Sequence, residues 1–147
     1  VVDTKSIEHK VLKNSNVPSI LKTFSKNIHK KYPQRIFEIS RVFNKIDNEI
    51  QEHYQLTVGL AHATVNFTEA SSYLNAFGKQ LLDIDLSTKA SENEIFVKGR
   101  AAEIIDEGGI KIGVIGEIKP QVLENFALRT PISLFDIDLD QLMKKRI

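Results

Sequence analysis

Three aspartates near the C-terminal end of the sequence have the type and spacing to do chemistry. Asp136, Asp138 and Asp140 occupy alternate positions, and in a strand this alternation places Asp136 and Asp138 on one face. Carboxylate oxygens are the ligands that Mg²⁺ prefers, so the pair is a candidate metal site. We favour a solvated sheet edge, or pairing with lysines, as the role of these aspartates, because acidic side chains are mostly exposed or paired.

The other ionisable side chains indicate structural roles rather than catalysis. The four histidines are scattered and have none of the spacings typical of metal ligands. We expect Glu38 to form a structural salt bridge, Arg41 to pair with a carboxylate, and Glu117 to lie at the start of a helix. The sequence has no cysteine, which excludes disulfides, thiolate metal sites and a cysteine nucleophile. We therefore predict no catalytic, cofactor-binding or metal-binding residues in this chain.

Five basic residues form a group in the first quarter of the sequence: Lys22, Lys26, Lys30, Lys31 and Arg35. No acidic residue interrupts them, so the group can contact the phosphates of a nucleic acid through charge alone. A solvated helix face, favoured by the negative end of the helix dipole, is the interpretation that we prefer. We assign no aromatic partner to the group and therefore predict no platform for stacked bases.

The elements that position these residues alternate between strands and short helices. Residues 110–115 alternate as in a half-buried strand, Gly113 and Gly116 suit close backbone packing, and Pro120 suits the first residue of a helix. Further helices are expected over 17–30, over 66–83 with a cap at Asn66, and after 139. Further strands are expected over 7–12, 35–43, 54–60, 94–98, 100–105 and 132–139, with polar loops at 44–52 and 87–93.

The order of these elements predicts an α+β domain with a mostly antiparallel sheet flanked by helices. The strands at 35–43 and 54–60 should pair antiparallel, with Phe37, Ile39 and Phe43 on one face of the first strand. We expect one domain over residues 1–147.

The composition is that of an ordinary globular domain, with 41% hydrophobic and 27% charged residues among 147. The formal net charge of +1 argues against a surface built mainly for polyanions. No apolar run approaches the roughly 18 residues of a membrane-spanning helix. The sequence begins with Val1 and shows no signal-peptide pattern, so we expect it to be a piece of a longer polypeptide.

Two segments carry a family resemblance. The segment GEIKPQVLEN, residues 116–125, is similar to GEIHPEVLEN in the β subunits of phenylalanyl-tRNA synthetases. The segment YPQRIFEISRVF, residues 32–43, resembles YPQRIFEIGDVV of the same family, with Ser40 in place of the usual glycine. The order and spacing of the surrounding elements also agree. The chain is identified as a member of this family, closer to the archaeal and eukaryotic β subunits than to the bacterial ones.

The resemblance implies a class II aminoacyl-tRNA synthetase fold without a working adenylate site. Catalytic relatives hold the ATP phosphates with arginines, because guanidinium groups match phosphate geometry. In this sequence Asn44 and Gln141 occupy the two arginine positions, and Val58 occupies the position of an expected glutamate. Asp136 and Asp138 stand where glycines are usual, and their charges would repel a triphosphate. The resemblance therefore implies a non-catalytic module, with ATP and Mg²⁺ used by the α subunit of the whole enzyme.

The function implied by the resemblance is assembly with the catalytic α subunit in a cytoplasmic (αβ)₂ heterotetramer that makes phenylalanyl-tRNA. The long interface helix of the family is expected upstream of Val1, so this chain alone should expose an apolar patch. Two alternatives remain open: a tRNA-contacting module that uses the basic face from Lys22 to Arg35, and an adenylate-forming ligase with a divergent site. We expect tRNA to bind the whole enzyme, and we expect no contact with a membrane.

Overall fold

A six-stranded antiparallel sheet lies at the centre of the computed structural model, which describes residues 13–144. Its strands are β1 (Gln34–Ile46), β2 (Glu49–Ala61), β3 (Ser87–Ala90), β4 (Phe96–Ile105), β5 (Lys111–Ile118) and β6 (Ile132–Asp138). They lie in the order β1–β2–β6–β5–β4–β3 across the sheet. The α+β architecture with an antiparallel sheet is confirmed, whereas the strand expected at 7–12 lies outside the described residues.

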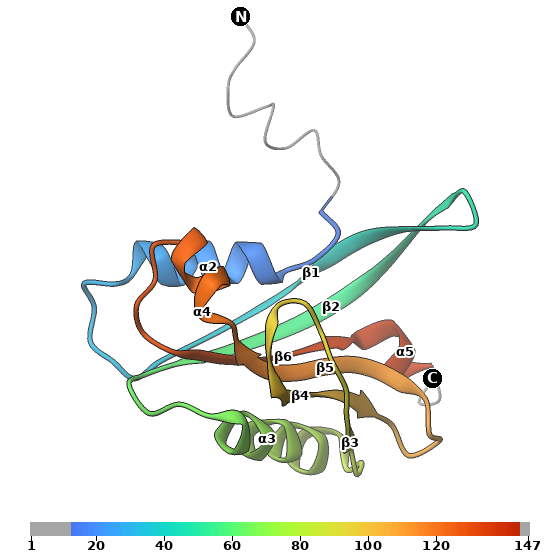
Figure 1. The fold of residues 1–147 in the computed structure, drawn as a ribbon. Helices are drawn as coiled ribbons and strands as arrows, with labels where there is room; N and C mark the ends of the chain where they lie inside the picture. The colour runs from blue at the N-terminus through green and yellow to red at the C-terminus, as the bar shows by residue number, and fades with distance from the viewer. Residues whose placement is uncertain (1–12, 145–147) are drawn as a thin grey trace, which may run out of the picture.

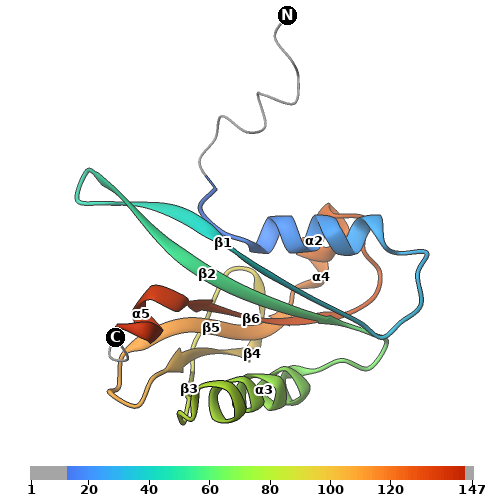
Figure 2. The same cartoon turned by 180° about the vertical axis from the view of Figure 1, so that it is seen from behind.

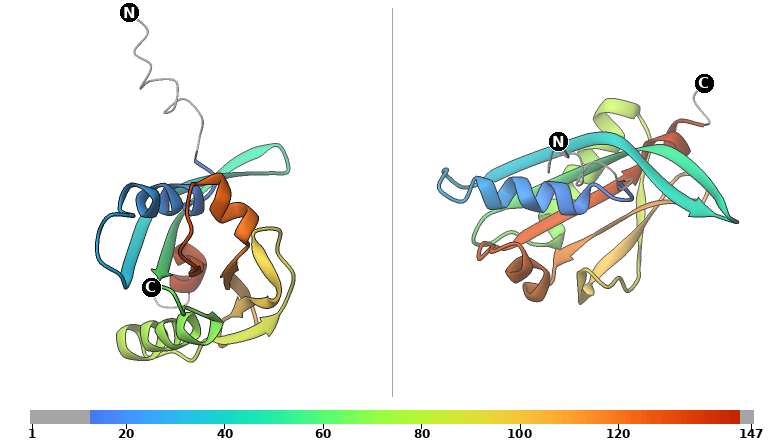
Figure 3. Two further views of the ribbon diagram at one scale, coloured as in Figure 1. Left: turned by 60° about the vertical axis from the view of Figure 1, so that its left-hand side comes forward. Right: turned by 90° about the horizontal axis from the view of Figure 1, so that it is seen from above.

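Helices cover both faces of the sheet. Helices α2 (Val17–Lys26) and α4 (Pro120–Asn125) lie on one face, which we call the α2 face. Helices α3 (Phe67–Ala76) and α5 (Leu139–Met143) lie on the other, the α3 face (Figures 1 and 2). Figure 3 shows the sheet between these two layers. None of the helices between residues 13 and 144 has both the length and the apolar character needed to cross a lipid bilayer.

The β1–β2 hairpin is longer than the rest of the sheet. Its strands pair without interruption from Gln34 opposite Ala61 to Ile46 opposite Glu49. Asp47 and Asn48 form the turn with φ of 50° and 64°, the conformation that two-residue hairpin turns require. Because β6 pairs only with residues 55–61 of β2, the end of the hairpin extends beyond the neighbouring strands (Figure 1). The polar loop expected at 44–52 is wrong, since these residues continue the two strands.

Close packing at the centre of the sheet depends on glycine. A Cβ atom built at Gly113 would lie 1.9 Å from the carbonyl oxygen of Asp136, and one at Gly116 would lie 2.5 Å from the Phe96 ring. Neither position can hold a side chain without displacing a neighbour, so the predicted role of both glycines is confirmed. Pro120 begins α4 as predicted, because its fixed φ suits the first helical residue.

The helices begin where expected, and one ends early. Asn66 caps α3 by accepting a hydrogen bond from the Glu69 amide at 2.9 Å. The helix continues as a π-helical segment, η1 (Phe77–Leu81). Helix α2 ends at Lys26 rather than near Lys30, and Ile28 is consequently 42% exposed instead of buried.

The second half of the sheet differs from the expectation at two places. The predicted loop at 87–93 contains β3, which pairs with β4 from Ser87 to Ala90. The two short strands predicted at 94–98 and 100–105 form one strand, β4, with a register shift near Gly99. Gly99 has φ of +80°, a value that glycine adopts without strain.

Candidate functional site

A buried carboxylate lies at the middle of the α2 face. Asp136 is 9% exposed, and its two oxygens accept hydrogen bonds from Gln55 Nε2 at 2.8 Å and Thr57 Oγ1 at 2.7 Å. Burial raises the pKa of Asp136 from 3.8 to about 6; the Thr57 hydrogen bond opposes this rise and the charge of Asp138 adds to it. For Asp136 the predicted solvated edge or lysine partner is wrong, because β6 lies between β2 and β5 in the sheet interior and both partners are neutral, whereas Asp140 is exposed.

Gln55 connects this carboxylate to the start of α2. Its Oε1 accepts a hydrogen bond from the Asn16 amide at 2.9 Å. The Asn16 side chain donates to the Gln55 carbonyl oxygen at 3.0 Å and accepts from Ser40 Oγ at 2.5 Å. Asn16 is fully buried, so the chain entering α2 is fixed to β1 and β2 by polar contacts on the sheet surface. We call Asn16, Ser40, Gln55, Thr57 and Asp136 the polar network.

Charged residues surround the polar network. Lys13 pairs with Glu38, which confirms the structural salt bridge predicted for Glu38. His53 Nε2 lies 3.9 Å from Asp138 Oδ2, and Asp138 caps α5 by accepting from the Gln141 amide at 2.9 Å. This arrangement holds strands and helix ends together, with Glu38 and Asp138 each beside one basic side chain.

No arginine in residues 13–144 forms a hydrogen bond or an ion pair with the polar network. Arg35 stands over the Tyr73 ring at 5.8 Å on the α3 side, and Arg41 pairs with Glu52 at 3.6 Å, as predicted for a carboxylate partner. Arg100 pairs with Glu117, and Arg129 follows α4. Guanidinium groups that could hold a triphosphate on the polar network are therefore lacking among the described residues.

Val58 does not face the polar network. It packs with the core of the α3 face, whereas its neighbour Thr57 faces Asp136. The residue on the network side at this point of β2 is therefore a neutral threonine. Asn44 is half-buried in β1, and Gln141 lies in α5.

Sequence reasoning did not identify Asn16, Gln55 and Thr57 as a group. The available signal was the alternation of polar residues in two segments, Gln55 and Thr57 in one and the aspartates in the other. The sequence does not give the register between β2 and β6. Only the paired strands of the structure show that Thr57 lies opposite Asp136 and Gln55 opposite Asp138.

An exposed apolar surface lies on the α3 side of the β1–β2 hairpin. It is formed by Phe37, Ile39, Ile50 and Tyr54, which are 70%, 52%, 64% and 47% exposed; we call it the hairpin surface. Phe37 and Ile39 share a face as predicted, and Arg41 lies 6.0 Å from the Tyr54 ring. Such a concentration of exposed apolar side chains typically marks an interaction site.

The five basic residues of the sequence group are exposed but do not share one face. Lys22 and Lys26 lie on α2, and Lys30 and Lys31 lie in the turn after it. Arg35 projects to the opposite side of the sheet, where its guanidinium covers Tyr73 of α3. The structure therefore groups four lysines and separates Arg35 from them.

Glu117 lies at the start of a helix as predicted, although the helix is α3 rather than the one that follows it in sequence. Its carboxylate accepts from the Phe67 amide at 3.2 Å and from Arg100 at 3.1 Å. The contact fixes the first turn of α3 to β5, where a negative charge suits the helix dipole.

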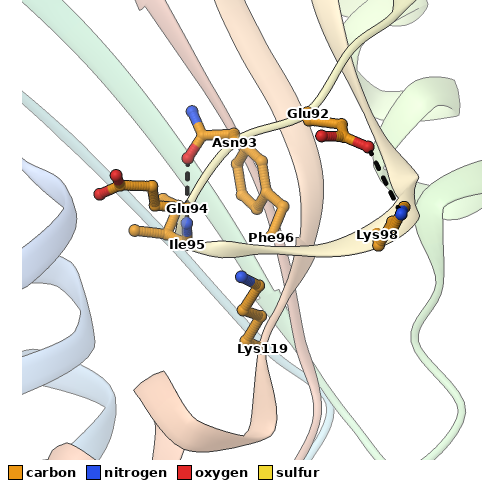
Figure 4. Close-up of a pocket in the computed structure, with 7 residues that line it drawn as sticks. All are labelled: Glu92, Asn93, Glu94, Ile95, Phe96, Lys98 and Lys119. Carbon is orange, nitrogen blue, oxygen red and sulfur yellow. Dashed lines mark hydrogen bonds and ion pairs between the residues drawn. The ribbon is translucent and has the colours of Figure 1, made fainter.

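A cavity of about 630 Å³ lies under the loop that leads into β4 (Figure 4). Glu92 and Glu94 line it together with Lys98 and Lys119, so its charges balance. Asn93 Oδ1 accepts a hydrogen bond from the Ile95 amide at 3.0 Å, and Glu92 Oε1 lies 3.9 Å from Lys98 Nζ. Both contacts stabilise the shape of the loop. We assign no function to this cavity. Between residues 13 and 144, no three His, Cys, Asp or Glu side chains are grouped to hold a metal ion.

Comparison with known proteins connects this geometry to one family. A family model described as the phenylalanyl tRNA synthetase beta chain CLM domain matches residues 3–139. The phenylalanine–tRNA ligase beta subunit of Archaeoglobus fulgidus is 37% identical over 95% of this chain and 24% of its own length. The beta subunits of Thermococcus sibiricus and Methanocaldococcus jannaschii are 39% and 34% identical, over 84% and 95% of this chain.

The chain spans about a quarter of the length of these relatives, 24%, 22% and 26% respectively. Both the family match and the relatives cover nearly the whole sequence. The chain therefore belongs to the phenylalanyl-tRNA synthetase β-chain family and corresponds to its CLM domain.

Proposed function

We propose that this chain is the non-catalytic, class II synthetase-like module of a phenylalanine–tRNA ligase β subunit, and that its hairpin surface binds the catalytic α subunit in an (αβ)₂ enzyme. The observation that carries the proposal is the exposure of Phe37, Ile39, Ile50 and Tyr54 together on one side of the β1–β2 hairpin. Burying such side chains against a partner removes apolar area from water, at about 25 cal/mol per Å².

The chemistry of the hairpin surface suits a protein partner. Aromatic residues and arginine are enriched at the centres of protein interfaces, and this surface combines Phe37 and Tyr54 with Arg41. Strand β1 is also an edge strand, the position at which another chain can add to a sheet, although its Phe43 amide already donates to the Lys13 carbonyl oxygen. The surface is therefore equipped for both side-chain and backbone contacts.

The α subunit is the occupant that the comparisons favour. The relatives are named as beta subunits of a phenylalanine–tRNA ligase, and a β subunit implies a second type of subunit. Another part of the β subunit is the competing occupant, because the chain spans only 24% of the first relative. The experiment below distinguishes the two.

The polar network supports the non-catalytic part of the proposal. A triphosphate site needs fixed cationic donors that stabilise charge on the phosphates. Here the centre of the sheet face holds Asp136, and Gln55 and Thr57 are already engaged in hydrogen bonds to it. The residues present do not fit ATP, and a six-stranded antiparallel sheet is compatible with a degenerate class II fold that leaves activation of phenylalanine to α.

Assembly can be tested in the full-length β subunit co-expressed with α. We expect replacement of both Phe37 and Ile39 by serine to weaken α binding at least about tenfold, because truncation of the few anchor side chains at the centre of an interface costs about 2 kcal/mol or more. Leu81→Ser is the matched control, since Leu81 is 72% exposed on η1, outside the hairpin surface.

Two outcomes would contradict the assembly role. One is unchanged α affinity in the double variant, measured by light scattering or by co-purification. The other is a lower melting temperature of the free β subunit at unchanged α affinity, which would show that β itself covers the surface.

The non-catalytic role can be tested by calorimetric titration of the full-length β subunit with ATP and Mg²⁺. We expect no saturable binding with a dissociation constant below about 1 mM. Tight binding that Asp136→Ala abolishes would place a nucleotide on the polar network and refute the degenerate site.

A further inference from the structure

The two faces of the β1–β2 hairpin differ in the sign of their charge. The strands pair in one unbroken register, so alternate residues of each strand lie on the same face. On the α3 side, which carries the hairpin surface, the charged residues of the hairpin are Arg35, Arg41, Lys45 and Glu52. On the α2 face they are Glu38 and Glu49, together with His53. Positive charge therefore predominates on the side with the exposed apolar side chains.

Two arginines flank the apolar centre of the hairpin surface. Arg35 and Arg41 lie on β1 on either side of its two exposed apolar residues, and their spacing of six residues corresponds to about 20 Å in a strand. Arg35 Cζ lies 5.8 Å from the centroid of the Tyr73 ring, and Arg41 Cζ lies 6.0 Å from that of Tyr54. An aromatic ring attracts the guanidinium and restricts its motion, so less conformational entropy is lost when it binds a partner.

The present contacts of these arginines are weak enough to be exchanged. Arg41 pairs with Glu52 at 3.6 Å, but the two side chains are 56% and 54% exposed, and an ion pair that open to water contributes little to stability. Among residues 13–144, Arg35 takes part in no ion pair. Both guanidinium groups are therefore available to carboxylates of another chain, whose planar geometry they match.

We propose that the hairpin surface recognises an acidic surface of α, on which two carboxylates about 20 Å apart bind Arg35 and Arg41 while apolar side chains between them cover Phe37 and Ile39. The inference rests on the proposed function, because it names the chemistry of the α surface that the hairpin surface binds. A nucleic acid is a poorer fit. Two of the four exposed apolar residues are isoleucines, which offer no flat ring to a base.

The charged and apolar parts of this surface should act on different rate constants. Charges at the rim of an interface change the association rate and its dependence on salt, whereas loss of contacts in the apolar centre mainly raises the dissociation rate. Substitutions at Arg35 and Arg41 should therefore slow association, and substitutions at Phe37 and Ile39 should speed dissociation. This difference separates the inference from the proposed function.

Stopped-flow kinetics of the full-length β subunit with α measure the effect of the arginines. We expect the double variant Arg35→Glu, Arg41→Glu to associate at least about tenfold more slowly at about 50 mM salt, and less than about twofold more slowly at about 1 M salt, where the Debye length is about 3 Å. The control is the double variant Lys89→Glu, Lys98→Glu, with the same change of charge at exposed positions of β3 and β4, near the opposite edge of the sheet.

Glu52 provides a test in the opposite direction. Its carboxylate is the negative charge on the α3 side of the hairpin, and its removal also releases Arg41. We expect Glu52→Gln to speed association about twofold or more at about 0.15 M salt. The matched control is Glu49→Gln, at an exposed glutamate three residues earlier on the other face. Equal effects of the two substitutions would show that net charge, not this face, determines the rate, and would refute the inference.

The carboxylates of α can be located by zero-length crosslinking of the complex. Arg35→Lys and Arg41→Lys keep the positive charge and supply an amine, which a carbodiimide joins to a neighbouring carboxylate. We expect each new lysine to be joined to an aspartate or glutamate of α, identified by mass spectrometry. Crosslinks from both positions that are confined to β would contradict the proposal.

The outcomes distinguish this inference from the proposed function. If the serine variants at Phe37 and Ile39 weaken α binding while the arginine variants associate at the native rate, the proposed function stands and the inference fails. If neither set of variants affects α binding, both fail. If glutamate at Arg35 and Arg41 lowers the melting temperature, glutamine replaces it, with about half the expected change in the logarithm of the association rate. Arginine variants that bind RNA more weakly but associate with α at the native rate would assign these side chains to a nucleic acid instead.

Discussion

The two faces of strand β2 differ in what covers their side chains. On the α2 face, Gln55 and Thr57 hydrogen-bond to Asp136 and are closed off beneath the start of α2. On the α3 side of the hairpin, Ile50 and Tyr54 are 64% and 47% exposed. The polar side chains, whose types suit chemistry, serve internal structure, whereas the apolar side chains, whose types suit a core, are open to a partner.

This difference has an energetic counterpart. A buried polar group that loses its partner costs the full desolvation penalty, whereas an exposed apolar side chain contributes little to folding. Substitutions in the polar network should therefore change stability strongly, and substitutions on the hairpin surface should change association instead. The three predictions below test this contrast, beginning with the largest effect.

Among the three predictions, Asn16→Leu should have the largest effect on stability. Leucine has a similar shape but can make none of the side-chain hydrogen bonds of Asn16, so Ser40 and the Gln55 carbonyl lose their partner. We expect the free energy of unfolding to fall by roughly 2–4 kcal/mol in urea denaturation. Asn14→Leu, at an exposed position two residues earlier, should change it by less than about 0.5 kcal/mol. Equal effects of the two variants would show that the hydrogen bonds of Asn16 do not stabilise the fold.

Asp136→Asn should stabilise the protein at neutral pH. The folded state holds the proton of Asp136 more tightly than the unfolded chain does, because burial raises its pKa from 3.8 to about 6. The stability contributed by this group is therefore complete below about pH 4 and is lost as the pH rises through about 6. Above pH 7 the cost of the buried charge is at most about 3 kcal/mol, at 1.36 kcal/mol per pKa unit.

Asparagine removes this cost and keeps both contacts, since its oxygen can accept from Gln55 and its amide can donate to the Thr57 hydroxyl. We expect the variant to be more stable than the native protein at pH 8 and to match it near pH 4, in urea titrations at several pH values. A constant difference across this range would show that folding does not shift the pKa of Asp136.

Much of this fold could be predicted from local pattern. The alternation at 110–115, the glycines at 113 and 116 and Pro120 were sufficient to predict β5 and α4, because these signals act within a few residues. The Asn66 cap belongs to the same class. The errors arose in segments whose secondary structure is determined by tertiary contacts. Residues 44–52 look like a loop by composition, and all but the turn residues Asp47 and Asn48 form strands because each has a partner in the hairpin.

The candidate sites were harder to predict because they depend on which face is covered. Alternation shows that Phe37 and Ile39 share a face, but it cannot tell whether another element packs on that face. The same limit applies to Asp136, which the sequence places in a strand without showing that β2 and β5 flank it.

Phe37→Ser should have the smallest effect on stability. Phe37 is 70% exposed, so its removal takes little apolar area out of the folded core, and we expect a change in unfolding free energy within about 0.5 kcal/mol. Leu56→Ser is the matched comparison, since Leu56 lies on the same side of the hairpin but is 5% exposed. It should cost roughly 2–5 kcal/mol, as large-to-small core substitutions do. A cost above about 2 kcal/mol for Phe37→Ser would mean that the hairpin surface is already covered within the chain. The proposed contact with the α subunit would then have to lie elsewhere, because a surface that is buried in the free chain has no apolar area left to offer a partner.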